Sequence, residues 1–379
     1  MNLCIASGSD LSRPSGDTIR VLSLVSGFEK TQNSINLVVP KPSKKHFAIN
    51  IANNVEIYNI FAKVKKGSLI NFAGMCILLI LKAKKIRKNT ESILQIEFSE
   101  LGGCFAFAGS SNYILDVQGL TFDEVRYKKK APFIPLKLYQ KSVYYLEKLA
   151  IKRASKVIAV SNPMKDFLIN KMEVSEDKII VIPNGYIESI IKKVQNIKEN
   201  KGMVSFIGSL SGWANVDKIV EGANALKNED VFFYIVGDGQ YRRKLESMVK
   251  KYNLRNVTFT GFIATEKAYE IMAKSEILLA PFPKTLALEV ACPIKLLEYM
   301  ALGKAMVVDN VGEIPAMLKR NDAALVSNPL DKNEFTNYIQ LLLNDSQLRK
   351  KISSNAKMLS KDFTWEKQAK KLVELYETL

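Results

Sequence analysis

Short apolar runs that resemble β-strands alternate with amphipathic, helix-like segments along most of this chain of 379 residues. The strand-like runs of the first half are Asn2–Ser7, Ile35–Pro40, Ile93–Phe98, Tyr113–Val117, Lys156–Val160 and Lys178–Pro183. Those of the second half are Met203–Ser209, Val231–Gly237, Val257–Thr260, Ile277–Phe282, Ala305–Val308 and Ala323–Val326. Such alternation is typical of parallel sheets built from strand–helix–strand units. The sequence therefore predicts an α/β fold with two doubly wound parallel sheets.

The alternation stops once and restarts, which indicates two domains. The charged segment at residues 186–201 shows no clear pattern and is predicted to be a linker. We expect one domain at residues 1–185 and a second at residues 202–362. The last segment, residues 363–379, has apolar side chains at helical spacing and is predicted to form a terminal helix.

Cysteine and histidine usage excludes several classes of protein. The four cysteines, Cys4, Cys76, Cys104 and Cys292, lie far apart without a Cys-x-x-Cys spacing, and His46 is the one histidine. Zinc sites and disulfide scaffolds are therefore not expected. The start of the chain lacks the pattern of a signal peptide. A reducing, cytoplasmic compartment fits these features best.

The net charge of +17 is concentrated in the first half of the chain. Residues 1–185 hold 27 Lys and Arg against 15 Asp and Glu, a net +12. Basic clusters at Lys63–Lys66 and Lys82–Lys88 flank the apolar run Ser68–Leu81, and Arg126–Lys130 forms another. The run has 14 residues, fewer than the roughly 20 that cross a bilayer as a helix. We favour a buried helix with a solvated basic end, and a helix on an anionic membrane surface stays open. Nucleic-acid binding is not expected, because the clusters lack interleaved aromatic residues and no known motif is present.

Ligands of doubly wound folds bind beyond the carboxyl ends of the strands, so functional residues are expected in the loops that follow each strand. A loop at Gly8–Gly16 leads from the first strand into a helix, where backbone N–H groups can receive an anion. In the second domain, Gly237 and Asp238 follow a strand end. No dinucleotide fingerprint or P-loop is present. These turns either bind a ligand or only reverse the chain.

The most informative stretch is CPIKLLEYMALGKAMVV, Cys292–Val308. Pro293 and Gly303 suit the start and end of a helix. Lys295 then lies in the first turn, where a cation costs about 0.3 to 1 kcal/mol against the helix dipole. One interpretation is an ion pair with Glu298, worth a few tenths of a kcal/mol. The other is an anion site in which Lys295, free N–H groups and the dipole hold a phosphate, while Glu298 accepts sugar hydroxyls.

Taken in order, several motifs resemble those of the retaining glycosyltransferases of the GT-B fold, in the large family 4. They are RPSG after the first strand, LDVQG, ASKVIAVSNPMKDFL, VIPNG, VGDG, FTGFI and EVACPIKLLEYMALGKAMVV, with FTWEKQAKKLVELY at the end. The resemblance implies two Rossmann-like domains that face a central cleft. It places the donor in the second domain and the acceptor in the first. It also implies that the terminal helix crosses back to the first domain.

The resemblance also implies roles for individual residues. Glu298 matches the glutamate that holds the donor ribose, and Glu289 the one that contacts the transferred sugar. One residue more than in the family's pattern separates them here, so that Val290 occupies the strict position. Gln118 stands where many members have a histidine facing the reacting sugar. The residues expected to act in the reaction are Gln118, Glu289 and Lys295, and those expected at the donor are Gly16, Ser209, Gly237, Asp238, Phe262, Ile263, Pro293, Ile294, Lys295, Leu296 and Glu298.

Two basic residues of the family's diphosphate site are replaced here, by Ser209 and Ala214, and Lys295 is expected to supply the missing charge. No Asp-x-Asp occurs, so no metal ion or other cofactor is expected. The resemblance predicts transfer of a hexosyl group from a nucleotide-diphosphate sugar to a glycan or lipid-linked acceptor, with peripheral contact to an anionic membrane. Because of the replaced residues, an inactive family member that binds a sugar nucleotide or a partner protein stays open. A protein that only binds anionic surfaces is a third hypothesis, supported by charge alone.

Overall fold

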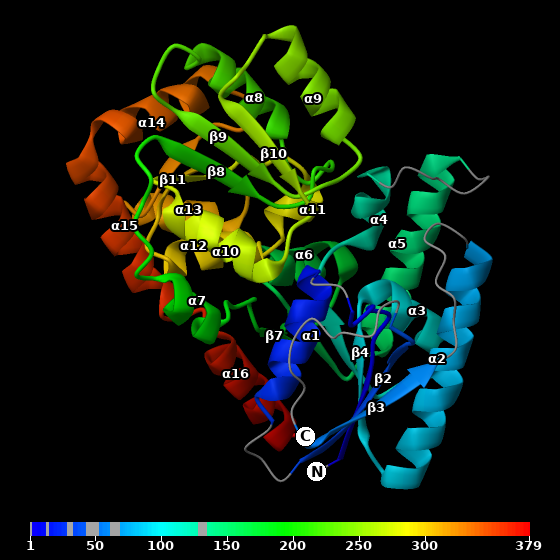
Figure 1. Cartoon of the computed structure of the whole chain (residues 1–379). Coiled ribbons are helices and arrows are strands. Elements are labelled where there is room, and N and C mark those ends of the chain that lie inside the picture. Colours follow the sequence, from blue (N-terminus) through cyan, green and yellow to red (C-terminus); the bar gives the residue numbers. More distant parts are fainter. Residues whose placement is uncertain (1, 13–14, 29–32, 43–52, 61–68, 128–134) are drawn as a thin grey trace. The chain divides into compact units, whose positions relative to one another are not determined.

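The computed structural model describes residues 2–12, 15–28, 33–42, 53–60, 69–127 and 135–379 (Figure 1). The chain divides into two compact units. The first comprises Met1–Pro183 and Trp365–Leu379, and the second Asn184–Thr364. Four features of the sequence lie outside the described residues: Arg13 and Pro14 of the RPSG loop, His46, the cluster Lys63–Lys66 and most of the cluster Arg126–Lys130.

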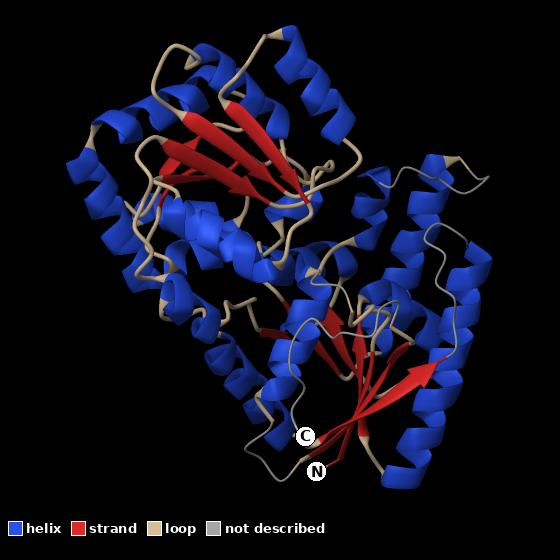
Figure 2. Cartoon of the chain, in the orientation of Figure 1, coloured by secondary structure: helices blue, strands red, loops and turns tan. Residues whose placement is uncertain are grey.

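The first unit is built on a seven-stranded parallel sheet in the order β3-β2-β1-β4-β5-β6-β7 (Figure 2). Its strands are β1 (Asn2–Ala6), β2 (Ser34–Pro40), β3 (Val55–Ile60), β4 (Ile93–Glu97), β5 (Ile114–Val117), β6 (Lys156–Ala159) and β7 (Ile179–Val181). All six predicted strands are present. The additional strand β3 lies at the edge and is largely half-exposed, so it lacks the continuous apolar run of a buried parallel strand.

Helices cover this sheet, and one of them comes from the far end of the chain. They are α1 (Gly16–Ser26), α2 (Leu69–Thr90), α3 (Ser99–Phe107), α4 (Thr121–Glu124), α5 (Leu136–Arg153), α6 (Asn162–Met172) and α16 (Trp365–Glu377), with the 3₁₀ turns η1 (Val125–Tyr127) and η2 (Glu176–Lys178). Helix α16 returns to the first unit and packs on α1, as the resemblance implied. There Tyr376 packs edge-on against Phe28, with ring centroids 5.7 Å apart.

Helix α2 contains the apolar run whose setting the sequence left open. Met75, Cys76 and Leu79 are buried where the helix packs against β1 and β2, whereas Ile77 and Leu81 are exposed. The expectation of a buried helix is therefore correct for one face only. Within the part of the chain that the structure describes, no helix is both long enough and apolar enough to cross a membrane.

The second unit contains a six-stranded parallel sheet in the order β10-β9-β8-β11-β12-β13. Its strands are β8 (Met203–Ile207), β9 (Phe232–Val236), β10 (Val257–Gly261), β11 (Ile277–Ala280), β12 (Ala305–Asp309) and β13 (Leu325–Ser327). Its helices are α7 (Glu188–Val194), α8 (Val216–Ala225), α9 (Arg242–Lys251), α10 (Thr265–Lys274), α11 (Leu286–Glu289), α12 (Ile294–Ala301), α13 (Glu313–Arg320), α14 (Lys332–Asn344) and α15 (Ser346–Ser360). The segment at residues 186–201, predicted as a linker, belongs to this unit and includes α7, whose Ile191 and Val194 are buried.

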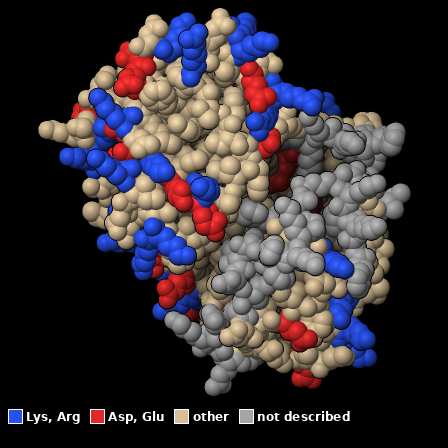
Figure 3. Space-filling model, in the orientation of Figure 1, with Lys and Arg blue, Asp and Glu red and all other residues tan. Residues whose placement is uncertain are grey.

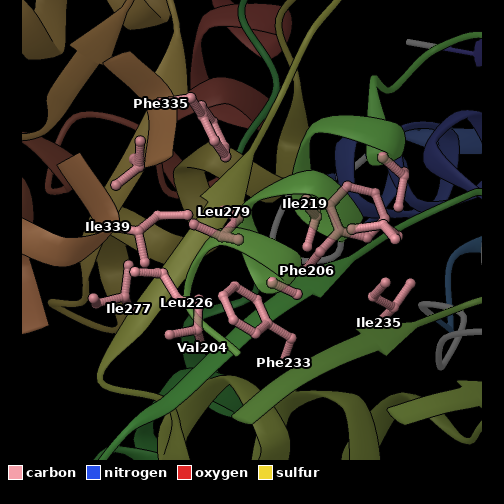
Figure 4. Packing of buried hydrophobic residues seen from close by; sticks show 14 of the residues in the cluster. Val204, Phe206, Ile219, Leu226, Phe233, Ile235, Ile277, Leu279, Phe335 and Ile339 are labelled. Atoms are coloured by element: carbon pink, nitrogen blue, oxygen red, sulfur yellow. The ribbon is translucent and has the colours of Figure 1, made fainter. Parts of the chain in front are cut away.

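Large apolar side chains fill the core on one side of this sheet (Figure 4). Strand residues such as Phe206, Phe233 and Leu279 meet Ile219 of α8 and Phe335 of α14 there, and all five are at most 1% exposed. Because both faces of a parallel sheet are covered by helices, its strands are apolar almost throughout. Polar groups are therefore concentrated at the strand ends.

One buried ion pair occurs at the equivalent place in each unit. In the first, Arg20 of α1 pairs with Asp116 of β5, with Nε and Oδ2 2.7 Å apart. In the second, Lys218 of α8 pairs with Asp309 of β12, with Nζ and Oδ1 2.6 Å apart. In both units the cation lies on the helix after the unit's first central strand, β1 or β8. The aspartate lies at or next to the end of the strand that is two places from this central strand in the sheet, β5 in the first unit and β12 in the second. The pairs fix α1 and α8 against the carboxyl edges of their sheets.

Candidate functional site

Helix α12 begins at the carboxyl edge of the second unit's sheet and is held there by two hydrogen-bonded side chains. Asn184 Nδ2 donates to the backbone oxygen of Cys292 at 2.7 Å, which fixes the loop before the helix. The hydroxyl of Tyr299 is buried. It accepts from the N–H of Ile207 at 3.2 Å and donates to the carbonyl of Leu279 at 3.5 Å. These contacts place the first turn of α12 beside the ends of β8 and β11.

Lys295 extends from this turn over two buried aromatic rings. Its Nζ lies 4.6 Å from the ring centre of Phe206 and 5.6 Å from that of Phe282. A Cβ atom at Gly208 would lie 2.8 Å from the same nitrogen, so the lysine reaches the loop directly after β8. Loss of hydration lowers the pKa of Lys295 to about 8, although the charge of Glu298 opposes this shift. The ring faces attract a cation but do not neutralise it.

Glu298 lies one turn further along α12 and is bound by a tyrosine, not by the lysine. The hydroxyl of Tyr269 on α10 donates to Glu298 Oε1 at 2.5 Å. Burial raises the pKa of Glu298 to about 7, and the Tyr269 hydrogen bond and the charge of Lys295 oppose the rise. Lys295 and Glu298 form no ion pair with each other or with any other described residue. The two side chains therefore make no ion-pair contact, and the charge of Glu298 compensates the half-buried Lys295 only from a distance.

Two loops pack closely behind this cation. Gly237, at φ 127°, directly follows β9, and a Cβ there would lie 2.0 Å from the carbonyl oxygen of Gly208, so this position requires glycine. Ser209 is exposed in the loop after β8. Asp238 accepts from the N–H of Gly239 at 2.7 Å and lies 3.4 Å from Arg242 Nη1. Its carboxylate therefore stabilises the turn and the start of α9.

The remaining predicted donor residues fall into exposed and buried groups. Phe262 is exposed and Ile263 half-exposed after β10, while Pro293 and Ile294 are half-exposed at the start of α12. The side chain of Leu296 is fully buried, and its N–H donates to the carbonyl of Pro293 at 3.1 Å. Leu296 is thus a core residue.

The structure shows which of the two neighbouring positions, Glu289 or Val290, is exposed to solvent. Val290 occupies the strict motif position but is 2% exposed, whereas Glu289 is half-exposed at the end of α11. The structure thus leaves Glu289 accessible at this turn. Ala214, which stands in the place of a basic residue of the family's pattern, is buried.

Gly16 and Gln118 belong to the first unit. Gly16 is exposed as the first residue of α1. Gln118 directly follows β5, and its Nε2 donates to Glu97 Oε2 at 2.6 Å. Each lies beyond the carboxyl end of a strand of this unit, where the sequence predicted ligand-binding loops.

The sequence interpretation missed the side chains that support Lys295 and Glu298. Tyr299 follows Glu298 directly, Tyr269 comes from a different helix, and Phe206 and Phe282 lie at strand ends. Tyr299, on the buried face of a predicted helix, is the one of the four that the sequence could have indicated, since a buried hydroxyl needs a hydrogen-bond partner. The other three became neighbours of the site only through the order of the strands.

A separate cavity of about 420 Å³ opens at β12 and β13 and is lined by Lys284, Asn310, Lys319 and neighbouring residues. None of the predicted site residues lines it. Among the described residues, no cluster of histidine, cysteine, aspartate or glutamate is suited to hold a metal ion. All four cysteines are free.

The chain is similar over its whole length to solved structures with two Rossmann-like domains. It matches sucrose-phosphate synthase from Thermosynechococcus elongatus with a TM-score of 0.82 and 16% identity, covering 99% of this chain and 98% of that one. It matches Anabaena Alr3699/HepE in complex with UDP and glucose with a TM-score of 0.74 and 16% identity, covering 100% of this chain and 99% of that one. The fold is that of the GT-B glycosyltransferases, as the sequence resemblance implied.

Family comparisons agree with the fold. The family model "Glycosyl transferases group 1" matches residues 188–358, and "Glycosyltransferase Family 4" matches residues 121–188. The uncharacterized glycosyltransferase MJ1178 of Methanocaldococcus jannaschii is 28% identical over 235 residues, which are 62% of this chain and 63% of that protein. An α-1,4-N-acetyl-D-galactosaminyltransferase of Campylobacter jejuni, named for an undecaprenol-linked glycan, is 28% identical over 178 residues, 46% of this chain and 44% of that protein. These matches support a group 1 glycosyltransferase of the GT-B fold, and the chain spans less than two thirds of either relative.

Proposed function

We propose that this protein transfers a hexosyl group from a nucleoside-diphosphate sugar to a glycan or lipid-linked acceptor, with retention of anomeric configuration and without a metal ion. The observation that carries the proposal is the Lys295 cation, which lies at the end of β8 and makes no ion-pair contact with a described carboxylate. An anionic group bound there would gain a charge-assisted contact that the free protein leaves unused.

A diphosphate is the anion best suited to this place. Ile294 and Lys295 are the first residues of α12, where N–H groups have no acceptor within the helix. These donors, the helix dipole and Lys295 together would stabilise the charge that develops on a departing diphosphate. Glu298 keeps Oε2 to accept a ribose hydroxyl while Tyr269 holds Oε1. The UDP complex of Anabaena HepE makes uridine nucleotides the first to test.

The reaction in this proposal needs no protein nucleophile. In the retaining family that the chain resembles, the acceptor hydroxyl attacks from the face that the diphosphate leaves. The bond from the sugar carbon to the diphosphate oxygen breaks, and that oxygen takes up the hydroxyl proton. Gln118 cannot take up a proton near neutral pH, so its role is to hold a substrate by hydrogen bonds. Glu289 is assigned to the transferred sugar, as the resemblance implies, and Gln118 to a substrate hydroxyl.

A membrane-bound acceptor is supported by the exposed face of α2. Ile77 is 57% and Leu81 62% exposed on this face, and Lys84, Lys85 and Lys88 continue it toward the end of the helix. Apolar side chains followed by lysines suit the surface of an anionic membrane. On the face drawn in Figure 3, by contrast, acidic and basic side chains are interspersed over the second unit. Ile77→Asp with Leu81→Asp should abolish sedimentation with phosphatidylglycerol vesicles and leave UDP binding intact.

The proposal is tested by a thermal-shift screen of UDP, GDP, ADP and their hexose conjugates. One nucleotide should raise the melting temperature, and Lys295→Ala and Glu298→Ala should each remove that increase. Lys284→Ala, which changes an exposed lysine of the same unit, is the matched control and should retain it. Stabilisation that persists in both site variants would refute the assignment of the site.

An inactive, nucleotide-binding protein is the second candidate, favoured by the buried Ala214 and by Gln118 in place of histidine. Release of nucleoside diphosphate from any sugar nucleotide, with lipid extract as the acceptor source, would exclude it. The same assay with added EDTA examines metal independence, since an EDTA-sensitive rate would contradict that part of the proposal.

A further inference from the structure

Gln118 is held by two buried acidic side chains at the carboxyl edge of the first unit's sheet. Its Nε2 donates to Glu97 Oε2 at 2.6 Å and contacts Asp116 Oδ2 at 3.4 Å. Glu97 ends β4 and is 1% exposed, and Asp116 in β5 is fully buried. The amide nitrogen of Gln118 therefore faces into the unit, toward two carboxyl groups.

We propose that Glu97 is a positioning residue of the glycosyl transfer reaction, which fixes the Gln118 amide so that its Oε1 oxygen is presented to a substrate hydroxyl. The inference rests on the proposed function, in which Gln118 faces the reacting sugar. An amide turned the other way would put its oxygen against the carboxyl oxygens of Glu97 and Asp116, which repel it. Gln118 Oε1 thus accepts a hydrogen bond from a substrate hydroxyl. A protonated histidine at this place would instead donate a hydrogen bond to that hydroxyl.

The second oxygen of Glu97 also accepts a hydrogen bond, which determines which groups donate and which accept in the hydrogen bonds around Gln118. Glu97 Oε1 accepts from Gln95 Nε2 at 2.5 Å, and Gln95 Oε1 accepts from the hydroxyl of Tyr376 on α16, also at 2.5 Å. Gln95 and Tyr376 are each 1% exposed. Donors therefore converge on Glu97 from both sides, so the orientation of Gln118 depends on a chain of contacts that reaches the terminal helix.

The charges of the cluster are arranged around Asp116. Arg20 donates to Asp116 through Nε at 2.7 Å and Nη2 at 2.9 Å, and through Nη2 also to the carbonyl of Ile182 at 3.0 Å. Glu97 has no cation of its own among the described residues, and burial together with the charge of Asp116 raises its pKa well above the usual range. A neutral Glu97 still accepts hydrogen bonds at both oxygens and directs its proton toward Asp116. The cluster then contains one negative and one positive charge.

Two substitutions separate positioning from a merely structural role. Glu97→Met keeps the length of the side chain but removes both acceptor oxygens. Glu97→Gln keeps an acceptor for Gln118, because Gln95 can turn over and donate to the Tyr376 oxygen instead. Tyr376→Phe alone changes the far end of the chain and is the matched control. The double variant Glu97→Gln with Tyr376→Phe removes the acceptor for the turned Gln95 and should again release Gln118.

The first measurement is the side-chain amide signal of Gln118 in ¹⁵N NMR spectra of the full chain, assigned by its absence in Gln118→Glu. The signal should be unchanged in Glu97→Gln and Tyr376→Phe, and shifted, with faster hydrogen exchange, in Glu97→Met and in the double variant. This measurement needs no turnover. If no sugar nucleotide is a donor, the proposed function fails while the orientation of Gln118 is still decided.

The second measurement is turnover of UDP-glucose, GDP-mannose and ADP-glucose, followed by release of the nucleoside diphosphate. With the sugar nucleotide that proves to be the donor, Glu97→Met should lower kcat about 10- to 100-fold, as expected for a misplaced substrate contact. The Kd of the nucleoside diphosphate should stay within about twofold, because its proposed site is in the second unit. Glu97→Gln should recover most of the rate. An unchanged kcat or amide signal in Glu97→Met, or equal losses in the Met and Gln variants, would overturn the inference. If Glu97→Met fails to fold, the double variant provides the same comparison.

Discussion

The carboxyl edges of the two sheets are similar in construction and differ in how their charges are satisfied. Each has a buried ion pair at the equivalent place, Arg20 with Asp116 and Lys218 with Asp309. In the first unit, hydrogen bonds continue from the pair's aspartate to Gln118, which is fully engaged at its nitrogen. In the second unit, Asp309 accepts from the N–H of Phe282, whose ring lies beside Lys295, a cation that no described carboxylate contacts.

This difference assigns distinct tasks to the two edges. Paired buried groups fix geometry, because removing either partner leaves a charge without compensation. A half-buried cation without a counterion costs free energy in the unliganded protein and recovers it when an anion binds. The second edge is therefore suited to bind a charged donor, and the first to orient uncharged hydroxyls.

The largest expected effect comes from breaking the two buried pairs in parallel. Asp116→Ala and Asp309→Ala each leave a buried cation unpaired, which should lower the free energy of unfolding by about 3 to 5 kcal/mol. Trp365 belongs to the first unit and Trp213 to the second. Tryptophan fluorescence during urea unfolding of single-tryptophan versions therefore reports on each unit separately.

The comparison predicts that each substitution acts first on its own unit. Asp116→Ala should shift the transition seen by Trp365, and Asp309→Ala the one seen by Trp213. Asp322→Ala, which breaks an exposed pair with Lys351, is the control and should change stability by less than about 1 kcal/mol. If Asp116→Ala or Asp309→Ala behaved like this control, the pairs would not be the supports described.

The second prediction concerns the cation without a counterion. Lys295→Met should reduce affinity for the bound nucleoside diphosphate by about 2 to 3 kcal/mol, because the diphosphate loses a partly desolvated partner. The same change should raise the melting temperature of the unliganded protein, since functional groups of this kind are kept at a cost in stability. Isothermal titration calorimetry and thermal unfolding measure the two effects.

Lys284→Met, at an exposed position in the same unit, should alter neither quantity. A Lys295→Met protein that binds the nucleotide as tightly as the unmodified chain would contradict the comparison between the two edges. A variant that lost both binding and stability would instead indicate a structural lysine.

The sequence predicted the sheets well because parallel strands are apolar almost throughout. It missed β3 because an edge strand has polar residues such as Glu56 and Asn59 on its exposed side. It treated the segment with α7 as a linker, although Ile191 and Val194 form a short apolar stripe. Local patterns of this length are weak signals until the surface that they cover is known.

For the site, the sequence predicted Lys295 and Glu298 because a cation at a helix start is unfavourable by itself. It could not show that the two avoid an ion pair, since that depends on Tyr269 from another helix. It also could not identify Glu97, whose contact with Gln118 arises only because β4 and β5 are neighbours in the sheet. Side chains that support a site across strands leave no pattern along the chain.

The third prediction uses the pKa of Lys295, lowered to about 8 by loss of hydration. The lysine is a cation below this pH and neutral above it. Affinity of the free protein for the nucleoside diphosphate should therefore fall about tenfold for each pH unit above 8. Affinity measured from pH 6 to 10 tests this, and Lys295→Met should remove the alkaline fall. A constant affinity up to pH 10 would show that the cation is not the diphosphate partner.

The smallest expected effect concerns Glu298, which must be ionised to accept a ribose hydroxyl strongly. Burial raises its pKa to about 7, and the Tyr269 hydrogen bond opposes the rise. Tyr269→Phe should therefore raise this pKa further. A hydrogen bond worth about 1 kcal/mol corresponds to less than one pH unit, so the acidic limb of nucleotide binding should move upward by that amount. Tyr338→Phe, which removes a similar hydrogen bond to Glu334 on α14, is the control and should leave the limb in place. If the acidic side of the pH profile moved equally in both variants, or in neither, Glu298 would not be the group that binds the ribose. Lys295 would then be the residue of this edge that selects the donor.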